Sequence, residues 1–272
     1  MSITLRAVPR FVVTGLLRHE PALSPLGLIL LAATLPTLFA MAIDVRQFGA
    51  ASVWLKPFKF QLSLGVHVLT VALALAALDP AARQGRTARI AITAMIAAVV
   101  FEAGYITLQG ALGLPSHFAP GLVGGILYGL MGLGATAIVL ATATLGGLIL
   151  RRPAAGVPGT LRLAAGSGLL VSGALGLVTG FAISLSQGPI VGEAGGAGVA
   201  LFGWSRSAGD LRVAHFIALH AAQGLPLLGL LLRETDPRIA RGPLILAACL
   251  WSALALGAML QALAGIPAFP MP

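Results

Sequence analysis

The ionisable side chains that lie deepest in the apolar runs of this sequence are His67, Glu102 and His220. Imidazole nitrogens and carboxylate oxygens bind transition metals and transfer protons. A charged group in apolar surroundings is costly unless it faces a partner, so such groups mark functional sites. These three side chains are therefore our first candidates for metal, redox or proton chemistry.

A second polar group lies at or near one end of the apolar runs. It comprises Lys56, Lys59, Gln109, His117, Asp210, Arg212 and His215. Gln223 follows His220 by three residues, which places both on one face of a helix. We predict that the second group forms the mouth of a site, with the first three residues below it.

Membrane-spanning helices are the elements that must position these residues. Of the 272 residues, 58% are apolar and 9% are charged, whereas a soluble domain carries about a quarter charged residues. Runs of about 20 apolar residues cross a hydrocarbon core of about 30 Å as helices. The predicted fold class is an all-α, polytopic membrane bundle, with residues 1–25 as an interfacial segment and 266–272 as a tail. The seven predicted spans are 26–44, 58–79, 88–110, 119–149, 161–186, 211–232 and 243–265.

The distribution of basic residues predicts the orientation of this bundle. Counted by connection, twelve of the 17 Lys and Arg residues lie on the side of the N-terminus and five lie on the other side. Cytoplasmic segments carry the excess of Lys and Arg. The N-terminus is therefore predicted to be cytoplasmic and the C-terminus periplasmic, in a bacterial inner membrane. We interpret the charge as topology, so the expected partner is the lipid bilayer and not a nucleic acid.

Helix geometry places the three deep residues at one level. His67 is nine residues into the second span, His220 is nine into the sixth, and Glu102 is eight from the end of the third. At 1.5 Å per residue, each lies about 12–14 Å below the outer boundary. His67 and Glu102 each belong to a row of polar residues on one helix face. The rows are Lys59, Ser63 and His67 on the second span, and Glu102, Tyr105 and Gln109 on the third.

The sixth span holds two histidines that point apart. His215 and His220 are five residues apart, which separates their directions by about 140° on a helix. His215 is therefore grouped with His117 near the surface. Just before this span, Ser207 and Asp210 form an S-x-x-D pattern, which predicts a capping box.

Two rows of small residues predict close helix packing or an oligomer interface, because they let backbones approach. The rows are Gly121, Gly125 and Gly129 in the fourth span, and Ser172, Gly176 and Gly180 in the fifth.

Three stretches, WLKPFKFQLS (54–63), LQGALGLPSHF (108–118) and residues 203–229, resemble a family of bacterial multi-pass membrane proteins with no established activity. LQGALG is also similar to a segment of haem A synthases. Ser63 and His67, as SxxxH, look like the second helix of alkaline ceramidase-type membrane hydrolases. The first resemblance implies these motif positions: Lys56, Pro57, Lys59, Ser63, Gln109, Ser116, His117, Phe118, Asp210, Arg212, His215, His220 and Gln223.

A redox protein is the first function that fits these residues. It would bind haem b or a transition metal (iron, copper or zinc), all of which accept imidazole ligands. The predicted metal ligands are His67, His117, His215 and His220, and the predicted cofactor-binding residues are His67, His220, Gln223, Gln109 and Lys59. Glu102, Asp210 and Arg212 are the predicted catalytic residues, with Glu102 as a ligand or proton carrier.

Two other functions remain open. One is a zinc-dependent hydrolase in which a metal-bound water attacks a lipid. The other is a transporter or proton-coupled carrier that relays protons at mid-membrane. The ligand would be a small molecule, a lipid or a quinone. The sequence has one cysteine, Cys249, which excludes disulfides and clustered thiolate ligands within one chain.

Overall fold

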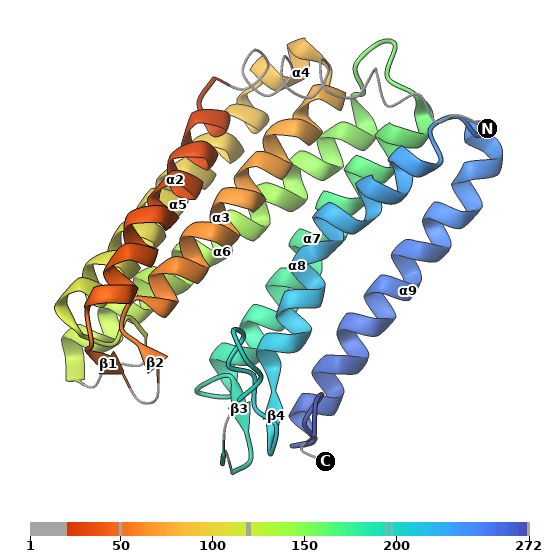
Figure 1. Cartoon of the computed structure of the whole chain (residues 1–272). Helices are drawn as coiled ribbons and strands as arrows, with labels where there is room; N and C mark the ends of the chain where they lie inside the picture. Colours follow the sequence, from red (N-terminus) through yellow and green to blue (C-terminus); the bar gives the residue numbers. More distant parts are fainter. Residues whose placement is uncertain (1–20, 49–50, 118–120, 194, 197, 271–272) are drawn as a thin grey trace. The chain divides into compact units, whose positions relative to one another are not determined.

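A computed structural model of the chain describes residues 21–48, 51–117, 121–193, 195–196 and 198–270. It confirms the predicted all-α class, since seven of the described helices are long and apolar enough to cross a membrane. The predicted interfacial segment lies mostly outside the described residues. The long helices are α2 (Leu23–Ile43), α3 (Leu55–Ala74), α5 (Arg86–Leu112), α6 (Gly121–Arg151), α7 (Gly159–Leu185), α8 (Leu211–Leu231) and α9 (Pro237–Leu263) (Figure 1).

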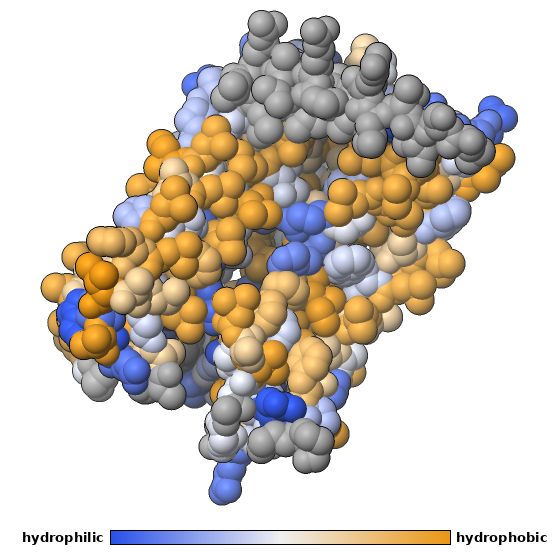
Figure 2. Space-filling view, in the orientation of Figure 1, coloured by the Kyte–Doolittle hydropathy of each residue, from blue (hydrophilic) through white to orange (hydrophobic). Residues whose placement is uncertain are grey.

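Short elements connect these helices. A 3-10 turn, η1 (Leu75–Ala77), extends α3 and is followed by the small helix α4 (Pro80–Gln84). Strands β1 (Gln47–Phe48) and β2 (Ala51–Ser52) form an antiparallel pair, and β3 (Ile190–Val191) pairs antiparallel with β4 (Gly209–Asp210). Apolar residues cover most of the helical surface in the face that Figure 2 shows, as expected for helices in contact with lipid.

The last helix begins six residues before the predicted start of the seventh span. Pro243 was predicted to open that span, but it lies inside α9, which begins at Pro237. Asp236 caps this helix by accepting a hydrogen bond from the Arg238 N–H. Proline suits the first helical position because its missing N–H has no partner there. The prediction gave too little weight to this capping signal.

The chain divides into two compact units at residues 138 and 139, within α6. In the first unit, α2 packs along α3 through two facing glycines. A Cβ at Gly27 would lie 2.6 Å from Leu69 Cγ, and a Cβ at Gly65 would lie 2.9 Å from Leu31 Cδ2. Each glycine is also close to the carbonyl oxygen of the other. Small residues therefore set this helix contact, as membrane packing favours.

In the second unit, glycines of α7 contact two other helices. Gly173 lies against the backbone of α6 at Val139 and Ala143, and Gly168 lies against Pro226 of α8. In the predicted row on this helix, the Ser172 hydroxyl donates to the Leu219 carbonyl at 2.8 Å. The prediction that the α7 row packs closely is confirmed.

The other predicted row has a different outcome. Apart from the nearby backbone of α6 itself, no described atom lies within 4 Å of the Cβ positions of Gly121, Gly125 or Gly129. Within the first unit, the structure therefore contradicts the predicted close packing of this row. An oligomer contact through α6 stays a prediction.

Candidate functional site

The predicted site residues fall into both units. The first unit contains Lys59, His67, Glu102, Gln109 and His117, and the second contains Asp210, Arg212, His215, His220 and Gln223. That His67, Glu102 and His220 share one site stays a prediction.

In the first unit, the stretches 54–63 and 108–117 pack against one another. A Cβ at Gly110 would lie 2.6 Å from Pro57 Cγ, so only glycine lets α5 approach α3 this closely. One turn deeper, the Gln61 amide nitrogen donates to Thr107 Oγ1 at 3.2 Å, and its carbonyl oxygen accepts from Thr37 Oγ1 at 2.8 Å. A buried amide with partners on two helices fixes the alignment of α2, α3 and α5.

The end of α5 turns the chain back over α3. Gly113 adopts a left-handed conformation, with φ of 69°. The Leu114 N–H donates to the Gln109 carbonyl at 2.9 Å, which completes a Schellman-type end. The second glycine of LQGALG therefore serves the turn, and the turn brings Ser116 and His117 to the head of α3.

Lys56 and His117 form a direct contact at this end of the first unit. The Lys56 Nζ lies 3.0 Å from His117 Nδ1. An ammonium group only donates, so Nδ1 accepts and the neutral ring carries its hydrogen on Nε2. The rings of Phe60 and Tyr128 flank the imidazole, with centroids at 6.4 and 6.1 Å. Burial, followed by the charge of Lys56, lowers the pKa of His117 to about 4. His117 is therefore neutral at pH 7.

Glu102 lies deeper in the same unit and is only 3% exposed. Its carboxyl faces α6, where a Cβ at Gly134 would lie 2.7 Å from Oε1. Oε1 is buried and has no hydrogen-bond partner among the described residues. Lys56 attracts this carboxylate electrostatically. His67, on α3, is also buried. Both side chains therefore lie in the interior of their unit.

In the second unit, Asp210 is the N-cap of α8 and its side chain is fully buried. The carboxylate accepts from the N–H groups of Ser205 and Arg212, at 2.8 and 3.0 Å, and from the Arg212 guanidinium at 2.5 Å. The predicted capping box is wrong in one respect. Ser207 does not cap α8, because its hydroxyl donates to the Gly195 carbonyl at 2.9 Å.

The two histidines of α8 point apart, as predicted. His215 Nδ1 lies 2.8 Å from Thr179 Oγ1, and that hydroxyl lies 2.8 Å from the Leu175 carbonyl. Because a carbonyl only accepts, the hydroxyl donates to Leu175 and the imidazole N–H donates to the hydroxyl. His220 Nδ1 donates to the Phe216 carbonyl at 2.7 Å. With Nδ1 donating, the neutral form of each ring keeps a lone pair on Nε2.

An aromatic cluster beside His220 could not be found from the sequence. Trp204 stacks on Phe202 at 4.3 Å and on Phe269 at 5.7 Å, and it meets Phe216 edge-on. The His220 ring lies 3.9 Å from the Phe216 ring. Phe269 is 65 residues from Trp204, so no local pattern links them.

Among the described residues, no three His, Cys, Asp or Glu side chains gather as a metal ion would require. Comparison with protein-family models, curated proteins and solved structures found no match for this chain. The resemblances stated above stay predictions.

Proposed function

We propose that this multi-pass membrane protein is a proton-coupled carrier, in which Glu102 binds and releases the proton. The observation that carries this proposal is the buried Oε1 of Glu102, which has no hydrogen-bond partner among the described residues, although the backbone N–H of Ala135 interacts with the carboxyl group. A buried carboxylate oxygen without a donor is unfavourable. Taking up a proton removes the charge, which makes the carboxyl a natural proton-binding group.

Lys56 supplies the charge balance for this step. Its ammonium group attracts the ionised form of Glu102 and donates to His117 at the end of the unit. When Glu102 is protonated, Lys56 loses that counter-charge. The protonation state of Glu102 is therefore coupled to the position of Lys56 and to its contact with His117.

Infrared difference spectroscopy of the protein in bilayers tests the proposal. We expect a protonated-carboxyl C=O band that grows on acidification and shifts in D2O, because the proton comes from water. The band should be absent in Glu102→Gln. The matched control Glu193→Gln makes the same change at an exposed loop residue and should keep the band. If wild type and Glu102→Gln give the same spectra, Glu102 is not the proton-binding group.

A second candidate is the binding of haem b or a transition metal through His220. It is favoured by the hydrogen bond from Nδ1 to the Phe216 carbonyl, because ligating histidines usually donate their other nitrogen in this way. Nε2 would be the ligand atom, and a haem or metal would supply redox or Lewis-acid chemistry. An absorption spectrum and elemental analysis of the purified protein test whether it binds haem b or a transition metal. We expect a Soret band or bound metal that is lost in His220→Ala, and a colourless, metal-free protein would contradict the idea.

A further inference from the structure

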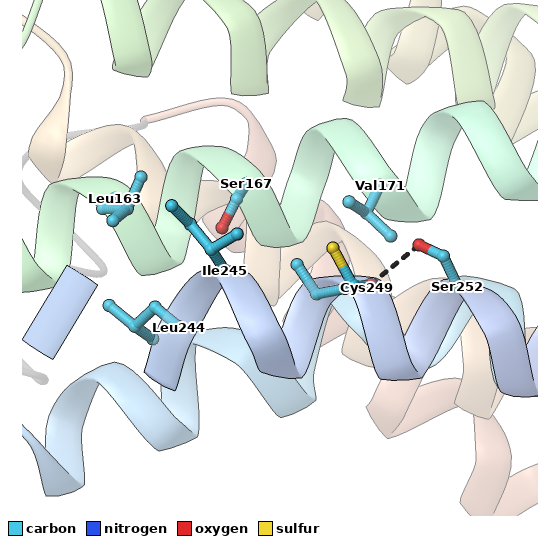
Figure 3. A pocket seen from close by; sticks show the side chains of 8 residues that line it. Leu163, Ser167, Val171, Leu244, Ile245, Cys249 and Ser252 are labelled. Atoms are coloured by element: carbon cyan, nitrogen blue, oxygen red, sulfur yellow. Dashed lines mark hydrogen bonds between the residues drawn. The ribbon is translucent and has the colours of Figure 1, made fainter. Parts of the chain in front are cut away.

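A groove lies between α7 and α9 in the second unit, with a volume of about 400 Å³. Figure 3 shows side chains of both helices pointing into it. Among the residues that line it are Leu163, Ser167 and Val171 from α7, and Leu244, Ile245 and Cys249 from α9. The lining on α7 runs from Leu163 to Val171, which are eight residues apart, or about 12 Å along the helix axis. This groove is independent of Glu102 and of the proposed proton chemistry.

The groove offers an apolar lining despite its hydroxyl groups. The Ser252 hydroxyl donates to the Ala248 carbonyl at 2.8 Å, as the dashed line in Figure 3 marks. The Ser167 hydroxyl donates to the Ala164 carbonyl at 3.4 Å. Both groups are satisfied by their own helices, so they impose no polar requirement on an occupant. Since both helices are membrane spans by length and composition, an extended hydrocarbon chain is the matching occupant.

One end of the groove is strongly basic. Arg241 precedes Leu244 and Ile245 by three and four residues, so it lies on the same face of α9, one turn nearer the helix start. Arg238 lies a further turn along that face, and both arginines are exposed. Neither has an ion pair among the described residues. This arginine-rich end is the one that the basic-residue count predicts to be cytoplasmic.

A neighbouring arginine adds to this charge. Arg162 directly precedes Leu163 of the groove, and its buried Nε has no hydrogen-bond partner among the described residues. Arg233, by contrast, is already paired with Glu234 at 3.0 Å. The unpaired positive charge is therefore concentrated where α7 and α9 begin.

We propose that this groove binds one acyl chain of an anionic phospholipid, with the lipid phosphate held by Arg238 and Arg241. Basic surfaces between membrane helices on the cytoplasmic side recognise anionic headgroups in this way. The apolar groove and the arginines together select a lipid over a free anion or a neutral lipid.

Native mass spectrometry of the full chain tests this proposal. The protein is released from micelles that contain equal amounts of phosphatidylglycerol and phosphatidylcholine. We expect the phosphatidylglycerol adduct to exceed the phosphatidylcholine adduct several-fold. The double variant Arg238→Gln/Arg241→Gln should lose this preference. Cys249→Phe, which fills the groove at an exposed position, should reduce both adducts.

The matched control is Arg151→Gln/Arg152→Gln, which removes two charges from the same unit at the end of α6, and it should keep the preference. Melting temperatures confirm that each variant is folded. Equal adducts of the two lipids in the wild type would overturn the proposal. So would an equal loss in the control double variant, or no effect of Cys249→Phe.

Discussion

Replacing Gly173 with alanine will sharply lower the stability of the protein, because α7 has no room for a methyl group there. A Cβ at this position would collide with the Val139 carbonyl and lie 2.6 Å from the Ala143 amide nitrogen. Both are backbone atoms of α6, so relief requires a shift of the whole helix. Overpacking costs about 1–3 kcal/mol, and we expect the upper end of this range. Thermal melting followed by circular dichroism measures the loss.

Gly147→Ala is the matched control, since it makes the same change on α6. Apart from the nearby backbone of α6 itself, no described atom lies within 4 Å of its Cβ position. Alanine favours a helix over glycine by about 0.8–1.0 kcal/mol. We therefore expect the melting temperature of this variant to stay equal or to rise. Similar destabilisation in both variants would mean that the close contact between α6 and α7 does not limit stability.

Asp210→Ala should have the second large effect, on the segment that precedes α8. The fully buried carboxylate caps the helix and binds the Arg212 guanidinium, which in turn donates to the Gly203 carbonyl at 2.7 Å. The Arg212 side chain is 39% exposed, so solvent screens this pair in part, and losing it together with the N-cap should cost less than the about 3–5 kcal/mol of a fully buried ion pair. We expect a lower melting temperature together with faster protease cleavage between residues 186 and 210.

The first unit offers a matched control for this variant in Asp44. This carboxylate binds Arg46 with the same two-residue spacing at 2.6 Å, but it is partly exposed. The Arg46 guanidinium, followed by the Trp54 indole N–H, holds the pKa of Asp44 well below its usual range. Solvent screens such a pair, so Asp44→Ala should change stability far less. Equal losses would contradict a special role for burial at Asp210.

The length and apolar composition of each segment were enough to predict the seven long helices, because these two properties decide which segments cross a membrane. Helical periodicity also separated the directions of His215 and His220. The N-terminal boundary of α9 was missed because the predicted seventh span began only at Pro243, six residues after the helix starts. Membrane helices tolerate an internal proline, and Asp236–Pro237 was the stronger signal.

The partners of the candidate residues could not be predicted, because they depend on contacts between distant segments. Lys56 meets His117 across 61 residues. Gly134 lies against the Glu102 carboxyl, but it is one of 35 glycines in the sequence, and no spacing distinguishes it from the others. Helical periodicity gives the face of one helix and does not identify what that face contacts.

The polar content of α8 has a consequence for how the protein is made. This helix carries Arg212, His215 and His220, and it is the least apolar of the seven long helices described. The free energy of moving a segment from the translocon into lipid depends on the hydrophobicity of its side chains. Insertion of α8 by itself is therefore the least favourable among these helices. Its main neighbour, α7, is synthesised first and already presents Gly168 to Pro226 and Ser172 to the Leu219 carbonyl. We infer that α7 acts as the docking surface that draws α8 into the bilayer during synthesis.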